Sequence, residues 1–292
     1  MIVPMSVTSS DSMTALHNLL EANCKVIRVS SYSRRPKPIF ESASSRVSIF
    51  SFKKTLSPIE KLFTSKVSRR NEENTIPKII GGLEFVDSLK VKLPGRYPKI
   101  GTSQQLVIIS KMFSADKKIA DYADEDGEPF YYRTSGGEYF NVITDYSTGS
   151  SQEKTFHTDK RFTKIIAATL STSLFWFYQQ TYTDGLHIKQ TELETFPLFD
   201  LESLTPAQIE RIEKIYDEYL KDIERNVKHS NFAEGSVYQQ SGAKIYKLVK
   251  SKPLIDKLDD MIGKFYGLND AEINFIKNFE LEIRMSGADN DN

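Results

Sequence analysis

The sequence predicts a mixed α/β protein, with an incomplete α/β sheet in residues 1–75, an α+β segment in residues 76–200 and a helical region in residues 201–292. Three observations lead to this prediction. About 55 N-terminal residues show the pattern strand, helix, strand, loop, strand, which is one end of an α/β sheet. The middle segment mixes strand and helix patterns, and helical periodicity dominates after residue 203. Three strands and one helix are too little for a whole sheet, so we expect the strands to need neighbours that the chain does not obviously supply.

The N-terminal elements follow one another closely. The apolar run at 1–7 predicts a buried strand, and Asp11 is placed to cap a helix in which apolar residues recur at helical spacing. Residues 25–32 are rich in β-branched side chains and predict a second strand. Two prolines and a run of small residues predict a loop at 33–45, and an alternating pattern predicts a third strand at 46–54.

The next part of the chain carries weaker patterns. Residues 56–80 are basic and are predicted to be loop-like. Beyond them, the predicted strands are 83–91, 129–135 and 138–144, and the predicted helices are Gln104–Met112 and Thr163–Tyr182. No internal repeat is visible, which favours an ordinary α+β arrangement over a solenoid.

The helical region near the C-terminus is the clearest part of the pattern. Thr205 is placed as the N-cap of a long helix. The apolar face of this helix comprises Ile209, Ile212, Tyr216, Tyr219 and Ile223. Residues 255–279 predict a helical hairpin, in which Gly267 ends the first helix and Asn269 or Asp270 caps the second.

Composition excludes several classes of protein. The 292 residues are enough for roughly two domains, and 39% apolar with 27% charged residues is typical of a globular chain rather than a disordered one. No apolar run reaches the roughly 18 residues that a membrane helix needs, and the N-terminus does not resemble a secretory signal. A single cysteine, Cys24, excludes an internal disulfide, so we expect a reducing, cytoplasmic setting and no membrane partner.

The net charge of zero hides an asymmetry along the chain. Residues 1–120 contain 20 Lys and Arg against 9 Asp and Glu, whereas residues 121–292 contain 19 against 30. A basic front half beside an acidic rear half indicates a polyanionic partner for the front. The alternative is that the acidic residues neutralise the basic ones within the fold.

Four segments, in order, carry a resemblance to a known family. They are MIVPMSVTSS (1–10), RRPKPIFESASSRVSIF (34–50), ATLSTSLFWFYQQTYTDGLHIKQTELETFPL (168–198) and KPLIDKLDDMIGKFYGLNDAEINFIKNFELEIRM (252–285). The set resembles the TaqI-type, or gamma-class, adenine-N6 DNA methyltransferases of restriction-modification and phage-defence systems. The first two segments are similar to the end of the class I methyltransferase sheet in that family, the third to its target-recognition domain and the fourth to its C-terminus.

The resemblance implies a DNA-binding function but not a complete enzyme. Such methyltransferases flip an adenine out of the duplex and methylate its exocyclic amine from S-adenosylmethionine. Their Asn/Asp-Pro-Pro-Tyr/Phe motif is missing, because no two prolines of this sequence are adjacent. The glycine-rich turn that holds the donor is missing as well, since Gly81-Gly82 is followed by a strand-like run. We therefore expect no cofactor site in this chain, and S-adenosylmethionine is implied only for a complete enzyme.

Other catalytic chemistries find little support. A nuclease motif that begins with Pro-Asp is absent, because the sequence contains no such pair. The four histidines, His17, His157, His187 and His229, are far apart and show no zinc-ligand spacing, so no metal is expected. They are interpreted as surface or packing residues.

Candidate DNA contacts in the first part of the chain include one aromatic residue and two basic clusters. The resemblance implies that Phe40, in a proline-bounded loop, stacks on the flipped adenine; the alternative is a ring that closes the sheet edge. The basic candidates for phosphate contact are Arg34, Arg35, Lys37, Lys66, Arg69 and Arg70. The alternative for these is a solvated run of charge.

Further candidates lie in the predicted recognition domain. The stretch PFYYRTSGGEYF offers Tyr132, Arg133, Ser135, Gly136 and Gly137, since arginine often reads guanine and glycines permit close approach. An ordinary hairpin with a tight turn is the alternative.

A second loop of this domain follows a helix of bulky apolar residues. Phe175 and Trp176 of that helix are expected to be core. Asp184-Gly185 predicts a turn that exposes His187 and Lys189. The resemblance places this loop near DNA.

Two functional hypotheses follow. In the first, the chain is the DNA-recognizing part of a site-specific adenine-N6 DNA methyltransferase, active only with a separate chain that carries the catalytic half. In the second, it is a DNA-binding specificity module or decayed fragment without methyltransferase activity. Both predict double-stranded DNA as a partner, and the first predicts exposed apolar surface on residues 1–55.

Overall fold

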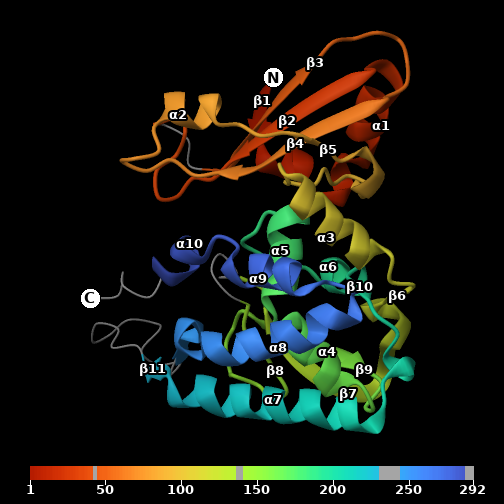
Figure 1. Cartoon of the computed structure of the whole chain (residues 1–292), viewed down its shortest axis with the longest axis vertical. Coiled ribbons are helices and arrows are strands. Elements are labelled where there is room, and N and C mark those ends of the chain that lie inside the picture. The colour runs from red at the N-terminus through yellow and green to blue at the C-terminus, as the bar shows by residue number, and fades with distance from the viewer. Residues whose placement is uncertain (42–44, 136–140, 230–243, 287–292) are drawn as a thin grey trace. The chain divides into compact units, whose positions relative to one another are not determined.

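The computed structural model describes residues 1–41, 45–135, 141–229 and 244–286 (Figure 1). The chain divides into two compact units. The first comprises Met1–Ser110 with Tyr178–Gly185, and the second comprises Lys111–Phe177 with Leu186–Asn292. Both units combine helices with a sheet, so the mixed α/β class is confirmed. The division at 1–75, 76–200 and 201–292 stays a prediction.

A five-stranded sheet forms the centre of the first unit. Its strands are β1 (Ile2–Pro4), β2 (Val26–Tyr32), β3 (Val47–Phe52), β4 (Lys61–Ser68) and β5 (Val86–Asp87), and they lie in the order β1-β3-β2-β4-β5. Strand β3 is antiparallel to β1 and β2, whereas β4 is parallel to β2. The predicted order of strand, helix, strand, loop and strand is confirmed, although the first strand stops at Pro4.

The prediction of a loop-like segment at 56–80 is wrong. Strand β4 and helix α2 (Ile76–Gly81) lie within it, and β4 supplies β2 with a neighbouring strand. The basic residues of this segment concealed an alternation, in which Leu62 and Thr64 are buried while Lys61 is exposed and Phe63 is half-buried. A half-buried strand requires only this alternation, whatever the charge on its outer side.

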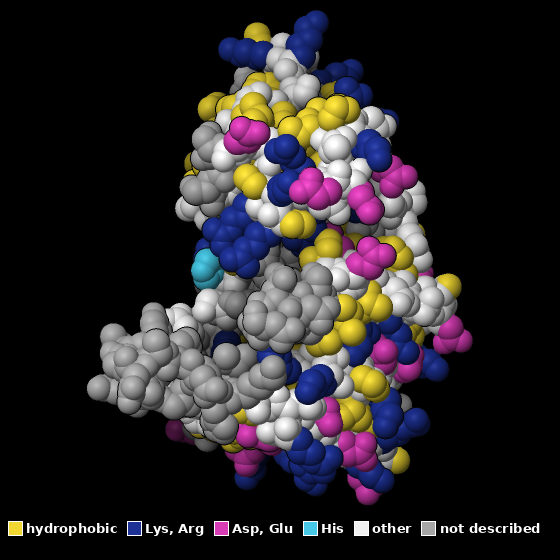
Figure 2. Space-filling view, turned by 90° about the vertical axis from the view of Figure 1, so that its left-hand side faces the viewer, with side chains coloured by type: hydrophobic (Ala, Val, Ile, Leu, Met, Phe, Trp, Pro, Cys, Tyr) yellow, Lys and Arg dark blue, Asp and Glu magenta, His cyan; other side chains and the backbone are white. Residues whose placement is uncertain are grey.

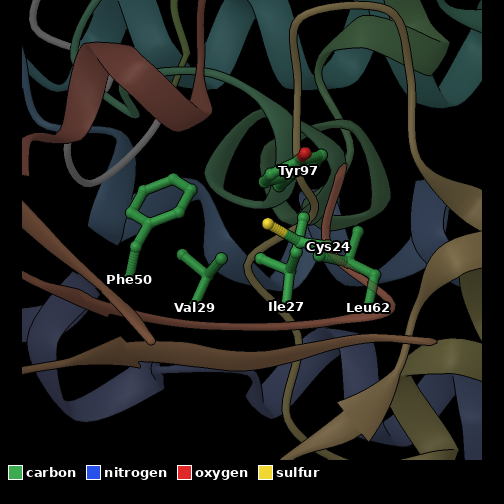
Figure 3. Packing of buried hydrophobic residues seen from close by; sticks show 6 residues of the cluster. All are labelled: Cys24, Ile27, Val29, Phe50, Leu62 and Tyr97. Atoms are coloured by element: carbon green, nitrogen blue, oxygen red, sulfur yellow. The ribbon is translucent and has the colours of Figure 1, made fainter. Parts of the chain in front are cut away.

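Helix α1 (Thr14–Asn23) covers one face of the sheet. Figure 3 shows the cluster beneath it, formed by Cys24, Ile27, Val29, Phe50, Leu62 and Tyr97. Leu20 packs against this cluster, and the ring of His17 stacks on Tyr97 at 3.8 Å between centroids. His17 is buried, and desolvation lowers the pKa of its imidazole. This histidine is a packing residue, as predicted.

Short helical turns and one longer helix complete the first unit. The 3-10 turns are η1 (Met5–Thr8), η2 (Asp11–Met13) and η3 (Leu89–Val91). The strand predicted at 83–91 is reduced to β5, and η3 replaces its last three residues. Helix α3 (Ser103–Phe113) confirms the helix predicted over Gln104–Met112.

In the second unit, a three-stranded antiparallel sheet has the order β8-β7-β9. Its strands are β7 (Ala123–Arg133), β8 (Ile143–Thr144) and β9 (Glu153–Thr158). Strand β7 confirms the strand part of the prediction at 129–135, while residues 138–140 of the next predicted strand lie outside the described residues. Two small pairs join β6 (Lys117–Lys118) to β10 (Pro197–Leu198) and β11 (Val227–His229) to β12 (Lys244–Tyr246).

Helices form the rest of the second unit. They are α4 (Thr163–Leu170), α5 (Ser173–Tyr182), α6 (Gln190–Glu194), α7 (Pro206–Arg225), α8 (Lys252–Phe265), α9 (Asp270–Asn278) and α10 (Leu281–Ser286), with 3-10 turns η4 (Ile119–Tyr122), η5 (Leu201–Ser203) and η6 (Leu248–Ser251). Helix α5 begins in the second unit, and its last residues, from Tyr178 on, belong to the first. The side chain of Thr205 caps α7, Gly267 adopts a φ of 68° just after α8, and Asn269 caps α9, as the sequence predicts. No helix of the described residues is long and apolar enough to cross a membrane.

The single helix predicted over Thr163–Tyr182 is broken after Leu170. Asp259, which is 2% exposed, accepts a hydrogen bond from the backbone N–H of Ser173 at 2.8 Å and thereby caps a new helix. The guanidinium of Arg284 lies 4.7 Å from the ring centre of Trp176. The hydroxyl of Thr172 also accepts from the backbone N–H of Phe175 at 3.2 Å, so a local N-cap and a carboxylate from a distant helix together stabilise the start of α5. Trp176 is 1% exposed, so its predicted core position is confirmed.

Candidate nucleic-acid interface

The two basic clusters predicted in the first part of the chain meet at one edge of the sheet. Strands β2 and β4 run parallel, so Arg34 and Arg35, which follow β2, lie at the same edge as Arg70, which follows β4. The backbone N–H of Lys37 donates to the carbonyl of Arg70 at 3.1 Å, which joins the two segments directly. We call Arg34, Arg35, Lys37, Lys66, Arg69 and Arg70 the strand-end cluster. The carboxyl ends of parallel strands are the usual location of ligand sites in α/β sheets.

The members of this cluster differ in their access to solvent. Arg35, Lys37 and Lys66 are exposed, whereas Arg69 is buried and donates from Nη1 to the hydroxyl of Ser33 at 3.1 Å. Arg69 therefore holds the two strand ends together, and its guanidinium is less suited to phosphate contact than those of its neighbours.

Two further interactions define the outer side of the cluster. Arg70 is half-buried and donates from Nη1 to the carbonyl oxygen of Pro38 at 3.1 Å. Lys37 pairs with Glu72, and the hydrogen bond from Lys37 lowers the pKa of the Glu72 carboxyl. Because Glu72 is 84% exposed at its side chain, this ion pair is weak, and a phosphate can replace the carboxylate. Figure 2 shows Lys and Arg side chains, in dark blue, gathered in several groups on one face of the chain.

Phe40 lies in the loop between β2 and β3, close to this edge. Its neighbour Ile39 is buried in a cluster with Tyr32, Val47 and Ile79, which anchors the loop. Phe40 itself is 38% exposed. An exposed ring beside the strand-end cluster is available to a base, as the stacking hypothesis requires.

A buried arginine that the sequence did not single out fixes a turn in the first unit. Arg46 is 5% exposed and donates from Nη1 to the carbonyl of Asp184 at 2.6 Å. Gly185 follows with a φ of 67°, and a Cβ there would lie 2.5 Å from Nη1 of Arg46 and 2.5 Å from Oε1 of Gln180. The predicted Asp184-Gly185 turn is therefore confirmed, and glycine is required at its second position.

In the second unit, the structure brings together the two predicted recognition segments. Ser135 forms a β-bridge with His187, and the backbone N–H of Ile188 donates to the carbonyl of Thr134 at 3.1 Å. His187 and Lys189 are exposed, as predicted. The sequence offered no signal for this pairing, because about 50 residues separate the segments.

Tyr132 and Arg133 are less accessible than the prediction assumed. Tyr132 is 1% exposed, so its ring has no surface to offer to a base. Arg133 is half-buried, donates to the carbonyl of Lys244 at 3.0 Å and lies 5.2 Å from the ring centre of Tyr246. Burial lowers the pKa of its guanidinium. The predicted residues Gly136 and Gly137 lie outside the described residues.

Asn141 is a polar residue that the sequence did not single out. Its side chain is 7% exposed, and within the described part of the chain neither Oδ1 nor Nδ2 has a hydrogen-bond partner. The buried hydroxyl of Tyr132 is likewise without a described partner. Unsatisfied buried polar groups are rare, so Asn141 and Tyr132 mark a second candidate position within this unit.

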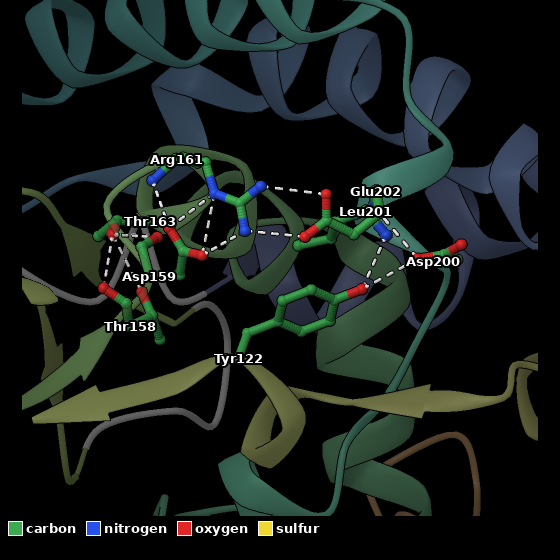
Figure 4. Close-up of polar contacts among 8 residues, drawn as sticks. All are labelled: Tyr122, Thr158, Asp159, Arg161, Thr163, Asp200, Leu201 and Glu202. Atoms are coloured by element: carbon green, nitrogen blue, oxygen red, sulfur yellow. Dashed lines mark hydrogen bonds and ion pairs between the residues drawn. The ribbon is translucent and has the colours of Figure 1, made fainter.

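An acidic pocket in the second unit has the opposite character. It has a volume of about 510 Å³ and is lined by Lys117, Asp121, Tyr122, Ala123, Asp124, Asp159, Arg161, Asp200 and Glu202. Figure 4 shows that Arg161 pairs with Asp159 and Glu202, at 2.7 and 2.8 Å from its Nη2. Carboxylates therefore neutralise this arginine and repel phosphate. The described residues contain no group of three or more acidic, histidine or cysteine side chains that could hold a metal.

Comparisons with known proteins do not identify the chain. No family model matches it, and no curated protein matches it.

Proposed function

We propose that this chain is the DNA-recognizing part of a site-specific adenine-N6 DNA methyltransferase and binds double-stranded DNA through the strand-end cluster. The observation that carries this proposal is the convergence of two basic segments at the carboxyl ends of β2 and β4. The first unit as a whole contains 17 Lys and Arg against 9 Asp and Glu, which favours a polyanionic ligand. The four ordered segments that resemble the gamma-class family support the methyltransferase context.

The chain does not fit the methyl donor by itself. In the described residues, β2 is followed by Ser33-Arg34 and β4 by Arg69-Arg70, and neither turn is glycine-rich. Family members hold S-adenosylmethionine at a glycine-rich turn, so the donor would have to be held by a separate chain that carries the catalytic half.

Two titrations of the purified chain test the proposal. Fluorescence anisotropy with a labelled duplex should show binding that weakens strongly with salt, because released counterions drive phosphate contact. Isothermal titration with S-adenosylmethionine should show no heat of binding. Failure to bind any duplex at low salt would refute DNA recognition, and binding of the donor would refute the division of labour between two chains.

The second functional hypothesis, a DNA-binding specificity module without methyltransferase activity, predicts the same results in both titrations. The two hypotheses are distinguished by adding a chain that contains the Asn-Pro-Pro-Tyr motif and the donor site of a gamma-class enzyme. Restored adenine methylation in the mixture supports the methyltransferase context, whereas duplex binding with no methylation supports the specificity module.

A further inference from the structure

The two faces of the five-stranded sheet are covered to different extents. On the face that α1 covers, Ile27, Val29, Phe50 and Leu62 are all buried. The strand register places a second set of residues on the other face. Ile2 lies opposite Ile49, and Arg28 lies opposite both Ser51 and Phe63. The other face can therefore be followed residue by residue across four strands.

Part of this second face is closed by the chain itself. Near the carboxyl end of β2, Ile39 and Ile79 pack onto Tyr32 and Val47. Away from that end, no comparable cover exists among the described residues. Ile2 is 57% exposed. Arg28, Ser51 and Lys61 are exposed, and Phe63 is half-buried. Ile49 is half-buried as well and lies at the border, where it packs against the cluster of Tyr32 and Val47. We call Ile2, Arg28, Ile49, Ser51, Lys61 and Phe63 the open face.

Among the described residues, the open face includes the only parallel strand pair of the five-stranded sheet, β2 with β4. The other three strand pairs are antiparallel, and a largely antiparallel sheet can leave one face in water. The open face includes Arg28 and Phe63 of this pair, directly opposite each other. Covering it would bury the apolar side chains that now contact water, which is a favourable contribution to binding.

The charges on the open face are positive. The guanidinium of Arg28 lies 5.4 Å from the ring centre of Phe63, and Nζ of Lys61 lies 5.7 Å from it. Neither cation has an ion-pair partner in the described part of the chain, whereas the nearby Lys25 is already paired with Glu60 at 3.1 Å. A ligand that brings carboxylates to Arg28 and Lys61 therefore complements this surface.

We propose that the open face binds an amphipathic helix of another protein chain. The apolar side of the helix would cover Ile2, Ile49 and Phe63, and acidic residues on its flanks would pair with Arg28 and Lys61. Addition of a strand at the free edge of β1 is a poorer solution, because β1 has only three residues and the last is Pro4, which lacks an N–H. This inference does not rest on DNA binding, since Arg28 and Lys61 lie near the amino ends of β2 and β4, away from the strand-end cluster.

A designed peptide serves as the probe. A helix of about 18 residues is about 27 Å long and can cross four strands spaced by about 4.8 Å. One peptide carries leucine along one side and glutamate on its flanks, and a second carries lysine in place of glutamate. Anisotropy with the full chain should show the glutamate peptide binding at least tenfold more tightly than the lysine peptide. The double variant R28E/K61E should reverse this preference.

The matched control is K78E/K90E, which changes the same charge at two exposed lysines outside the open face. It should leave the preference unchanged, and circular dichroism should show that both double variants fold. Equal binding of the two peptides, or no response to R28E/K61E, would overturn the proposal. Binding of phosphatidylserine vesicles or of an oligothymidylate that R28E/K61E alone abolishes would also overturn it, because the face would then serve a lipid or a nucleic acid.

Discussion

Alanine at the three exposed members of the strand-end cluster, Arg35, Lys37 and Lys66, should weaken DNA binding in a way that depends on salt. Each phosphate contact contributes about 0.9 to the slope of log affinity against log salt, so loss of three contacts flattens the slope by about 2.7. Between about 50 and 200 mM salt, those three contacts alone account for about a 40-fold change in affinity. The triple variant should therefore bind DNA much more weakly than the unmodified chain at low salt, and the two affinities should converge as salt rises.

The assay is anisotropy of a labelled duplex over this range of salt, with the triple variant K53A/K54A/K90A as the matched control. Lys53, Lys54 and Lys90 are also exposed cations of the first unit, so the control removes the same net charge. If both variants flatten the slope equally, the unit attracts DNA only through its total charge, and the strand-end cluster is not the contact surface. If neither does, DNA binds elsewhere.

Three further substitutions test the structure. Gly185→Ala should destabilise the fold by about 1–2 kcal/mol, since the added Cβ meets Arg46 at a φ of 67°; a melting temperature equal to that of the unmodified chain would contradict this. Asn141→Leu should stabilise it by about 1 kcal/mol in urea unfolding, because a buried amide without a described partner is removed; destabilisation would mean that the amide is satisfied. Burial raises the pKa of Asp259 from 3.8 to about 6. The folded state therefore holds this proton more tightly than the unfolded state, and protonation of Asp259 stabilises the fold. Relative to Asp259→Asn, the unmodified chain should lose about 2.4 kcal/mol of unfolding free energy as pH rises from about 4 to 7, and parallel pH profiles would refute the shift.

Much of the fold follows from local patterns in the sequence. The N-cap Thr205 and the cap Asn269 are visible in the sequence because capping is a contact between neighbours in the chain. The alternating and β-branched runs at 25–32 and 46–54 predict β2 and β3 for the same reason, since the two faces of a strand differ in burial.

The predictions that were wrong have two different causes, one within the segment itself and one that involves a distant residue. The sequence predicts a loop in place of strand β4 because Lys61 and Lys66 mask its alternation of buried and exposed residues. The start of α5 is capped locally by Thr172, whose hydroxyl accepts from the N–H of Phe175, and also by Asp259, which lies 86 residues from Ser173 in the sequence. No pattern within a window of one helix can reveal a cap supplied by another helix.

The candidate site shows the same limit. Each basic segment is visible in the sequence, but only the parallel pairing of β2 with β4 places Lys37 beside Arg70. Residue type also failed to separate Arg69, which is buried, from its exposed neighbour Lys66. Asn141 gave no signal, because a lone asparagine in a strand-like run is ordinary until its burial and partners are known.

The partition of charge between the two units sets a final constraint on the proposed function. The first unit contains 17 Lys and Arg against 9 Asp and Glu, and the second contains 22 against 30, so the whole chain is neutral. At physiological salt, charges are screened within about 8 Å, so the basic unit acts on DNA at contact and the acidic unit repels any duplex that approaches its own surface. Amide substitutions D124N, E125Q and D126N, at three exposed acidic residues of β7, should then raise affinity for a duplex of arbitrary sequence. Unchanged anisotropy titrations with that duplex would show that the acidic surface plays no part in orienting DNA on the basic unit.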